Sequence, residues 1–278
     1  MKQIHFIVCT ALLFTVQSCK KNDTLAPGVA AQAKCTIKSE TNDLIGNEAF
    51  WEYTFNDKGN LSVIKQFNRF GTLQATTTVG EIDLSYRSSG GETYYAYNAN
   101  IHSGNPTLLN ISSINSSGVS TPDHTTFTFF YDAKKRLIKV SQKTNNITTD
   151  NEWDMSIAYN DKDNVTSLSY QFTTGPITTF VTTVAGYDDK PNPYAAISSW
   201  KYLSVHFAWD NYDPQPIISA LSRNNPLDYT LGTVPNQWKR AIFYTYNRDG
   251  FPISVLNTNT SPSGSTGSFP QTFAYNCR

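Results

Sequence analysis

Residues 155–168 read MSIAYNDKDNVTSL, and this stretch decides the fold because its residues follow the pattern of a β-hairpin. Met155, Ile157 and Tyr159 alternate with other residues, which is the period-2 pattern of a strand with one buried face. Asn160 follows at once, and an Asn side chain can bond to the backbone two residues on and so begin a turn. A second strand then begins at Val165. The stretch therefore predicts two antiparallel strands joined by a tight turn.

The same pattern recurs along the chain as an internal repeat. The aromatic residues that precede the turn, Tyr131, Tyr159 and Tyr187, are 28 residues apart in both steps, and such regular spacing marks a repeat architecture. The copy at Tyr187 is degenerate. Three further copies are clear: WEYTFNDKGNLSVI at 51–64, FTFFYDAKKRLIKV at 127–140 and IFYTYNRDGFPISV at 242–255. Strands joined by short turns favour pairing between neighbours in the sequence.

One segment departs from the repeat. Ile197, Trp200, Leu203 and Phe207 recur at three- and four-residue steps, which favours a short helix between 193 and 207 over a strand. The residues from there to 238 contain four prolines and read as a long loop. We therefore predict an all-β fold of about fifteen strands. It is a long curved antiparallel meander of β-hairpin repeats, open or partly closed, with one short helix and a long loop over part of one face.

The N-terminus has the pattern of an exported lipoprotein. Lys2 precedes an apolar stretch from 4 to 16 that is too short to span a bilayer, and Val-Gln-Ser-Cys follows at 16–19. We expect a signal peptide over 1–18, lipidation of Cys19, a flexible tether over 19–34 and a single domain over 35–278. A plain secretory signal is the alternative. The expected location is the outer membrane, with the domain facing the periplasm or the cell surface.

Two cysteines remain for the folded domain, because Cys9 lies in the signal and Cys19 would carry lipid. In an exported protein Cys35 and Cys277 are a reasonable disulfide pair, and the alternative is two free thiols. The bond would join the first folded segment to the last residue but one.

Composition excludes some partners. The chain has 22 basic and 22 acidic residues, so it lacks the positive charge that nucleic-acid binding requires. Apart from His5 in the expected signal peptide, the histidines His102, His124 and His206 lie in three separate segments. No Cys-x-x-Cys or His-x-x-x-His spacing is present, so the sequence shows no pattern of a metal site. We expect no metal, no cofactor and no catalytic residues. The sequence leaves open a pair of carboxylates in a cleft, as in a glycan hydrolase.

Aromatic residues gather in the irregular segment and next to it. Exposed rings there could stack on sugars or on the apolar surface of a partner, whereas buried rings would only cap the sheet. The candidates for ligand binding are Trp200, Trp209, Tyr212 and Trp238.

The unit of aromatic residue, Asn or Asp, turn and Leu-x-x-Val resembles the YD repeat of RHS-type surface proteins. The chain is more similar still to uncharacterised YD-repeat-like lipoproteins of Bacteroidota, which pair a lipoprotein signal with units like YDDKPNPY at 187–194, LSRNNP at 221–226 and YTYNRDGFP at 244–252. The resemblance implies an anchored β-sheet protein of unknown function and transfers no catalytic residue.

These observations predict a monomeric, membrane-anchored envelope lipoprotein that is not an enzyme. Its expected role is a binding or structural module for a glycan or protein. The alternatives are a carrier whose curved sheet encloses a hydrophobic ligand, and a carboxylate-based glycan hydrolase.

Overall fold

The computed structural model describes most of the chain from Cys35 onward. The described residues are 35–42, 49–80, 83–89, 93–97, 105–114, 120–144, 152–173, 179–197, 199, 202–205, 213–232 and 235–277. All of them belong to one unit, Ala33–Arg278.

In the described part of the chain, sixteen strands follow one another in the order of the sequence, and short helical elements lie between the twelfth and thirteenth. The elements are β1 Cys35–Asn42, β2 Ala49–Phe55, β3 Leu61–Phe67, β4 Leu73–Val79, β5 Asp83–Ser88, β6 Thr93–Tyr97, β7 Leu108–Ile114, β8 Ser120–Tyr131, β9 Leu137–Thr144, β10 Trp153–Tyr159, β11 Val165–Phe172, β12 Thr179–Pro191, the 3₁₀ helix η1 Pro193–Ala196, α2 Gln215–Leu221, β13 Asn224–Leu231, β14 Trp238–Tyr246, β15 Pro252–Thr260 and β16 Thr266–Cys277.

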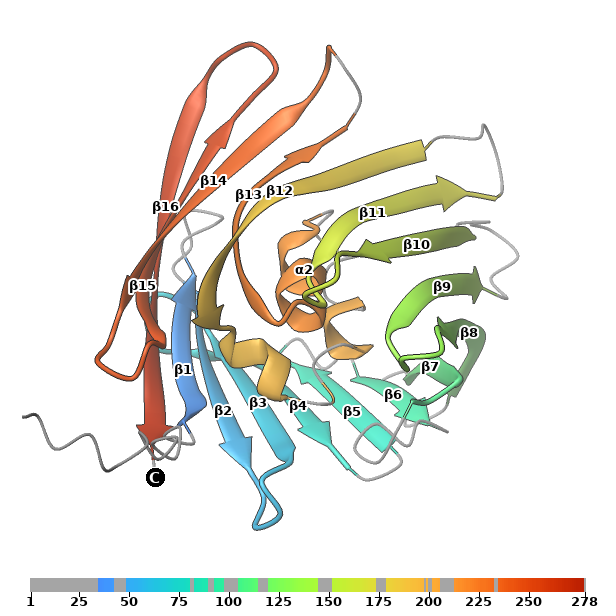
Figure 1. Ribbon diagram of the computed structural model, residues 1–278. Helices are drawn as coiled ribbons and strands as arrows, with labels where there is room; N and C mark the ends of the chain where they lie inside the picture. Colours follow the sequence, from blue (N-terminus) through green and yellow to red (C-terminus); the bar gives the residue numbers. More distant parts are fainter. Residues whose placement is uncertain are drawn as a thin grey trace, which may run out of the picture. The chain divides into compact units, whose positions relative to one another are not determined.

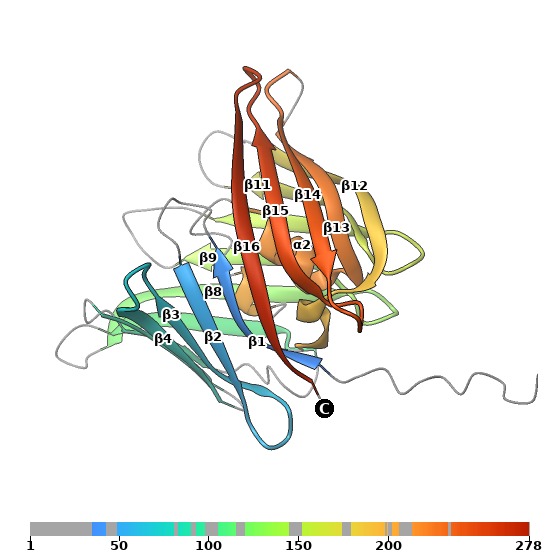
Figure 2. The same ribbon diagram turned by 90° about the vertical axis from the view of Figure 1, so that its left-hand side faces the viewer.

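Each strand pairs antiparallel with its neighbours in the sequence, and the order closes on itself. β1 pairs with β2 through Ser39–Asn42 and with β16 along a register that sets Cys35 against Cys277. Figure 1 shows the strands arranged as a ring, and Figure 2 shows β13 to β16 side by side in one wall. The predicted antiparallel meander is therefore confirmed.

The repeat is a turn with a fixed set of hydrogen bonds. The Oδ1 atom of Asn160 accepts from the backbone N–H groups of Lys162 and Asn164, both at 3.0 Å. Asp163, three residues after Asn160, has a positive φ, and the register shifts by one residue where Tyr159 meets Val165. The same pair of acceptor contacts recurs at Asn56, Asn68 and Asn247, each followed three residues later by a glycine with positive φ. Each copy is therefore a hairpin with a β-bulge, in which the Asn side chain bonds to the turn backbone.

The segment between β12 and β13 occupies the inside of the ring. η1, a helical turn at 202–205 and α2 make up its described part, and in Figure 1 the strands surround α2. Tyr202, Ile217 and Ile218 are almost fully buried and belong to the hydrophobic core together with inward residues of the strands. Burial of a large apolar side chain stabilises the fold by roughly 1.5–3 kcal/mol. The segment is therefore part of the core.

Two elements lie where the prolines indicated a long loop. Helix α2 begins just after Pro214 and contains Pro216 in its first turn, where a missing N–H has no intrahelical partner to lose. β13 contains Pro226, but its pairing with β12 is irregular there, so the ladder tolerates the proline. The helix expected over 193–207 consists, in its described residues, of η1 and the turn at 202–205.

The outer face of the ring is largely polar. Along β11, Leu168 and Tyr170 face inward, while Ser167, Ser169 and Gln171 alternate with them and face outward. β16 shows the same alternation, with Gln271 and Phe273 inward and Thr272 outward. A few outward residues, such as Phe243 and Leu256, are apolar and exposed. No helix within the described ranges is long and apolar enough to cross a membrane.

Candidate functional site

A buried carboxylate lies at the closure of the ring. Glu40 of β1 is 3% exposed and accepts hydrogen bonds from the phenols of Tyr53 on β2 and Tyr194 on η1. Gln271 Nε2 of β16 donates a third bond, at 3.0 Å. Strands from both ends of the domain and the interior segment therefore meet on one side chain.

Burial raises the pKa of the Glu40 carboxyl because desolvation penalises its charged form, while the three hydrogen bonds act in the opposite direction. Burial and the nearby Glu40 charge likewise raise the pKa of the Tyr53 and Tyr194 phenols well above their ordinary value. The two phenols therefore remain donors throughout the physiological pH range.

A second polar cluster fixes the start of α2 to the wall of the ring. Arg240 Nη1 of β14 contacts both carboxylate oxygens of Asp213, at 2.9 and 3.1 Å, and Tyr229 donates to the same carboxylate at 3.1 Å. The guanidinium also donates to Asn259 and lies over the Tyr229 ring. Both charged side chains are mostly buried, so loss of one partner would leave the other uncompensated.

A small cavity of about 60 Å³ lies between these clusters. Its lining includes Glu40, Asp213, Gln215, Tyr244 and Gln271. Sites for ligands of drug size measure roughly 300–1,000 Å³, so this cavity has room only for a few water-sized molecules. Glu40 and Asp213 both accept bonds from protein donors, which is typical of structural junctions.

Exposed aromatic rings lie at the ends of strands on another part of the interior face. Trp238 begins β14 and is 51% exposed, and it shares a face with Arg240 and Ile242 because alternate residues of a strand point the same way. Phe180 of β12 is 42% exposed and packs edge-to-face on Phe172. The interior face therefore presents aromatic rings to solvent where its strands end.

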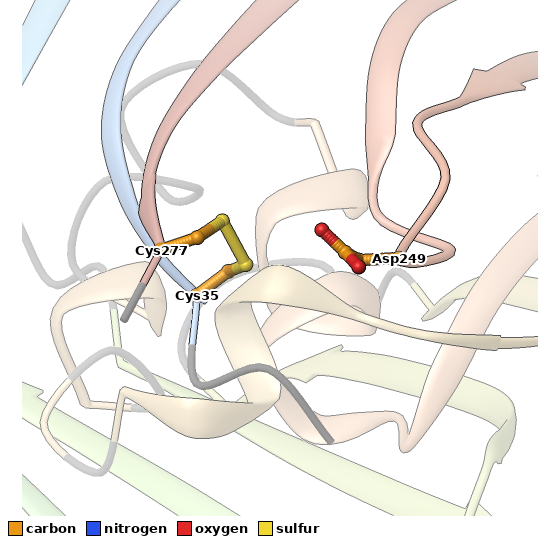
Figure 3. Close-up of side chains that lie close together, drawn as sticks. All are labelled: Cys35, Asp249 and Cys277. Atoms are coloured by element: carbon orange, nitrogen blue, oxygen red, sulfur yellow. A yellow bond between two sulfur atoms is a disulfide. The ribbon is translucent and has the colours of Figure 1, made fainter. Parts of the chain in front are cut away.

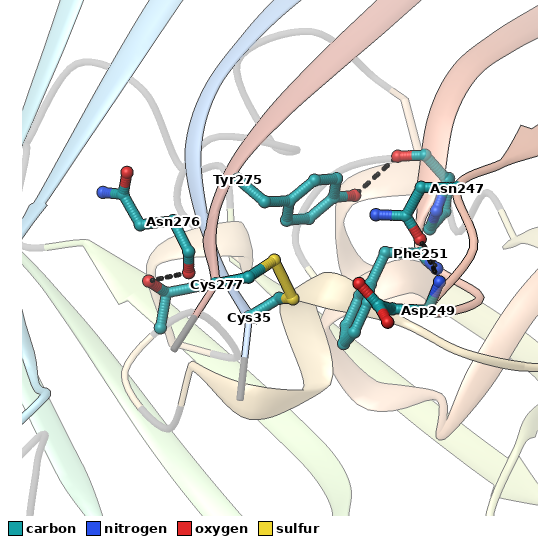
Figure 4. Close-up of a disulfide and its surroundings, with 9 residues drawn as sticks. Cys35, Asn247, Asp249, Phe251, Tyr275, Asn276 and Cys277 are labelled. Carbon is teal, nitrogen blue, oxygen red and sulfur yellow. Dashed lines mark hydrogen bonds between the residues drawn. A yellow bond between two sulfur atoms is a disulfide. The ribbon is translucent and has the colours of Figure 1, made fainter. Parts of the chain in front are cut away.

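The structure also contains a disulfide between Cys35 and Cys277, where β1 pairs with β16. Figure 3 shows the carboxylate of Asp249 beside the two sulfur atoms, with all three potential ligand atoms within 4.8 Å of one another. Because the sulfurs are bonded to each other, they cannot act as thiolate ligands, and the group is not a metal site. Figure 4 shows the nearby Tyr275, which donates to the carbonyl of Pro252 and packs on Phe251.

Of the residues predicted to bind a ligand, the structure places Trp238 in an exposed position. Trp200, Trp209, Tyr212 and the lipidation residue Cys19 lie outside the described residues. Sequence reasoning missed Glu40 because a register shift between Ile37 and Ser39 breaks the alternation of β1. Arg240 could have been found, since it alternates with Ile242 and Tyr244 on the inward face.

No protein-family model and no curated protein matches the chain. Solved structures with a similar fold include two porin-like proteins of Bacteroides. A porin-like protein from Bacteroides uniformis ATCC 8492 is 16% identical with a TM-score of 0.53, over 86% of this chain and 95% of its own. A porin-like protein from Bacteroides vulgatus ATCC 8482 is 8% identical with a TM-score of 0.54, over 87% of this chain and 98% of its own. At these identities the likeness concerns the fold alone.

Proposed function

We propose that this protein is a non-enzymatic envelope lipoprotein, anchored through Cys19, that serves as a binding or structural module for a glycan or an envelope protein. The fold shared with porin-like Bacteroides proteins supports a place in the cell envelope. The lipobox pattern at 16–19 supports anchoring by lipid.

The observation that carries the proposal is the packing of the ring by its own chain. Tyr202, Ile217 and Ile218 of the interior segment are at most 1% exposed and form one core with inward strand residues. A channel or a lipid carrier needs an open, lined interior, so this packing favours a rigid scaffold that binds at its surface.

The outer face supports an anchor outside the domain. A sheet embedded in lipid presents a continuous apolar band outward, whereas here Ser167, Ser169 and Thr272 face outward as well as the exposed Phe243 and Leu256. Association with the membrane would then rest on the acyl chains at Cys19, because two or more chains hold a soluble domain stably on a bilayer.

The test of anchoring is Cys19→Ala in the full-length chain. The variant should move from the membrane fraction to the soluble fraction. If it stays with membranes after a high-salt wash, anchoring through Cys19 is wrong. Protease shaving of intact cells then shows whether the domain faces the surface or the periplasm.

The test of binding uses two aromatic residues of the same strand. Trp238→Ala removes a ring on the interior face, and Phe243→Ala removes a 61% exposed ring on the outer face as a matched control. On glycan and envelope-protein arrays, Trp238→Ala should weaken binding by up to about tenfold, since stacking contributes roughly 0.5–1.5 kcal/mol. Equal losses in both variants, or no binding by the wild type, would contradict the proposal.

A further inference from the structure

β1 and β2 pair over only part of their length. Ser39–Asn42 pair with Ala49–Glu52, and the register ends there. Within the described part of the chain, Thr36 of β1 pairs only with β16, and Thr54 and Phe55 of β2 pair only with β3. Figure 1 shows β2 leaving β1 toward its hairpin turn. One edge of β1 and one edge of β2 therefore face each other where the two strands separate.

The divergence has a local cause. Ile37 pairs with Tyr275 and Ser39 with Ala274, so Lys38 is an extra residue in β1. A bulge bends the strand that contains it, and here β1 continues beside β16 as it separates from β2. The bulge therefore accounts for the early end of the β1–β2 pairing.

A groove of about 700 Å³ fills the space between the two edges. The lining residues include Thr36, Lys38, Glu52, Thr54 and Asn276, and the hairpin turn at 56–59 forms one end. This volume lies within the range of roughly 300–1,000 Å³ that ligand sites occupy. The groove is thus more than ten times larger than the interior cavity.

The chemistry of the groove favours an uncharged main chain as its occupant. Among the lining residues, Lys38 and Lys58 balance Glu52 and Asp57, so the formal charges cancel and select neither a polyanion nor a polycation. Every second residue of a strand edge presents its N–H and C=O to that side, and such edges are templates for another strand.

We infer that the groove between β1 and β2 binds an extended peptide segment of a partner protein by strand addition. The peptide's main chain pairs with the edge of β1 within Thr36–Lys38 and with the edge of β2 at Phe55, because the carbonyl of the adjacent Thr54 accepts a bond from Ser62 on the β3 side. Main-chain bonds supply the affinity, as in other β-augmentation complexes. This site lies apart from the Trp238 position of the proposed function.

The experiment is hydrogen exchange on the full mature chain with a capped hexapeptide of alternating Thr and Val as the probe. At saturating peptide, exchange within Thr36–Lys38 and at Phe55 should slow at least threefold. The same peptide with N-methyl groups on every second residue lacks the N–H donors toward one edge, and protection at that edge should be lost. Equal protection by both peptides, or protection confined to other segments, would overturn the inference.

Two variants sharpen the result. Thr54→Trp fills the groove and should weaken peptide protection at least threefold, whereas Thr245→Trp, an exposed threonine on β14, should leave it unchanged. If Thr54→Trp fails to fold, the comparison of the two peptides on the wild type still decides. The edge amides could also become protected without peptide when the protein concentration is raised. If the mass measured by light scattering doubles at the same time, a second copy of the chain occupies the groove and the inference of a peptide partner is refuted. Trp238→Ala should keep the peptide protection, which separates this test from the test of glycan binding.

Discussion

The phenolic hydroxyl of Tyr159 donates a 2.8 Å hydrogen bond to the carbonyl oxygen of Leu137, the first residue of the second strand in the preceding hairpin. Tyr187 makes the same bond to Val165 and Tyr275 to Pro252, each again the first residue of a strand. We call this contact the tyrosine tie. Successive hairpins are therefore joined by side chains as well as by the sheet.

Removal of one tyrosine tie should cost about 1 kcal/mol in the free energy of unfolding, the usual net contribution of a hydrogen bond. Tyr159→Phe keeps the ring and loses one bond. Tyr187→Phe loses a second bond as well, to Ser222 Oγ at 2.9 Å, and should be destabilised more. Urea denaturation of both variants checks the order, and an unchanged midpoint for Tyr187→Phe would show that the tie adds no stability.

Glu40→Gln should change how stability depends on pH. The pKa of Glu40 is raised in the folded chain, so folding is favoured while the carboxyl is protonated. The contribution of the protonated carboxyl to stability is fully present below the ordinary pKa of glutamate. It is lost as the pH rises from that value through the raised pKa of the folded chain. Glutamine does not titrate, so the variant should gain stability relative to the wild type across that window.

Denaturation curves from acid to neutral pH measure this difference, and a difference independent of pH would contradict the prediction. Glu40→Ala is the matched comparison. It leaves the buried donors of Tyr53, Tyr194 and Gln271 without their acceptor and should destabilise the fold at every pH, by on the order of 3 kcal/mol.

Replacement of Cys35 and Cys277 by Ser should lower stability by about 2–5 kcal/mol, because the bond closes a loop with a sequence separation of 242 residues. Thermal unfolding with and without reductant measures the loss. The double variant should be insensitive to reductant, and the wild type should yield no free thiol from these two residues on alkylation in denaturant. A wild type that is equally stable in reductant would refute the prediction.

The turn residues with positive φ give a pair of opposite substitutions. Lys135 has φ 62°, a conformation that costs a side-chain-bearing residue about 1 kcal/mol, so Lys135→Gly should stabilise the fold by up to that amount. Gly59 occupies the equivalent position with φ 79° and open space around it, so Gly59→Ala should destabilise by a similar amount through the backbone alone. Chemical denaturation of both variants should show opposite signs.

The repeat, the turns and the meander were predictable because they depend on neighbouring residues, as Asn160 and the alternation before it illustrate. The position of the interior segment was not predictable. Ile217 and Ile218 are buried, and they would be apolar in the sequence whether the segment covered a face of the sheet or filled the inside of the ring. Likewise, Trp238 was singled out for its type, but its neighbour Arg240 contacts Asp213 across a long stretch of sequence. Contacts of that kind leave no local pattern.

The closed order of the strands also bears on how the chain folds. Apart from the pairing of β1 with β16, each ladder joins strands that follow one another in sequence, so each can form at low cost in loop entropy. The β1–β16 ladder must instead bring together Cys35 and Cys277 from opposite ends of the domain. Hairpin formation should therefore be fast and ring closure slow. The disulfide between the two cysteines should then form late, after the ring has closed and brought them together.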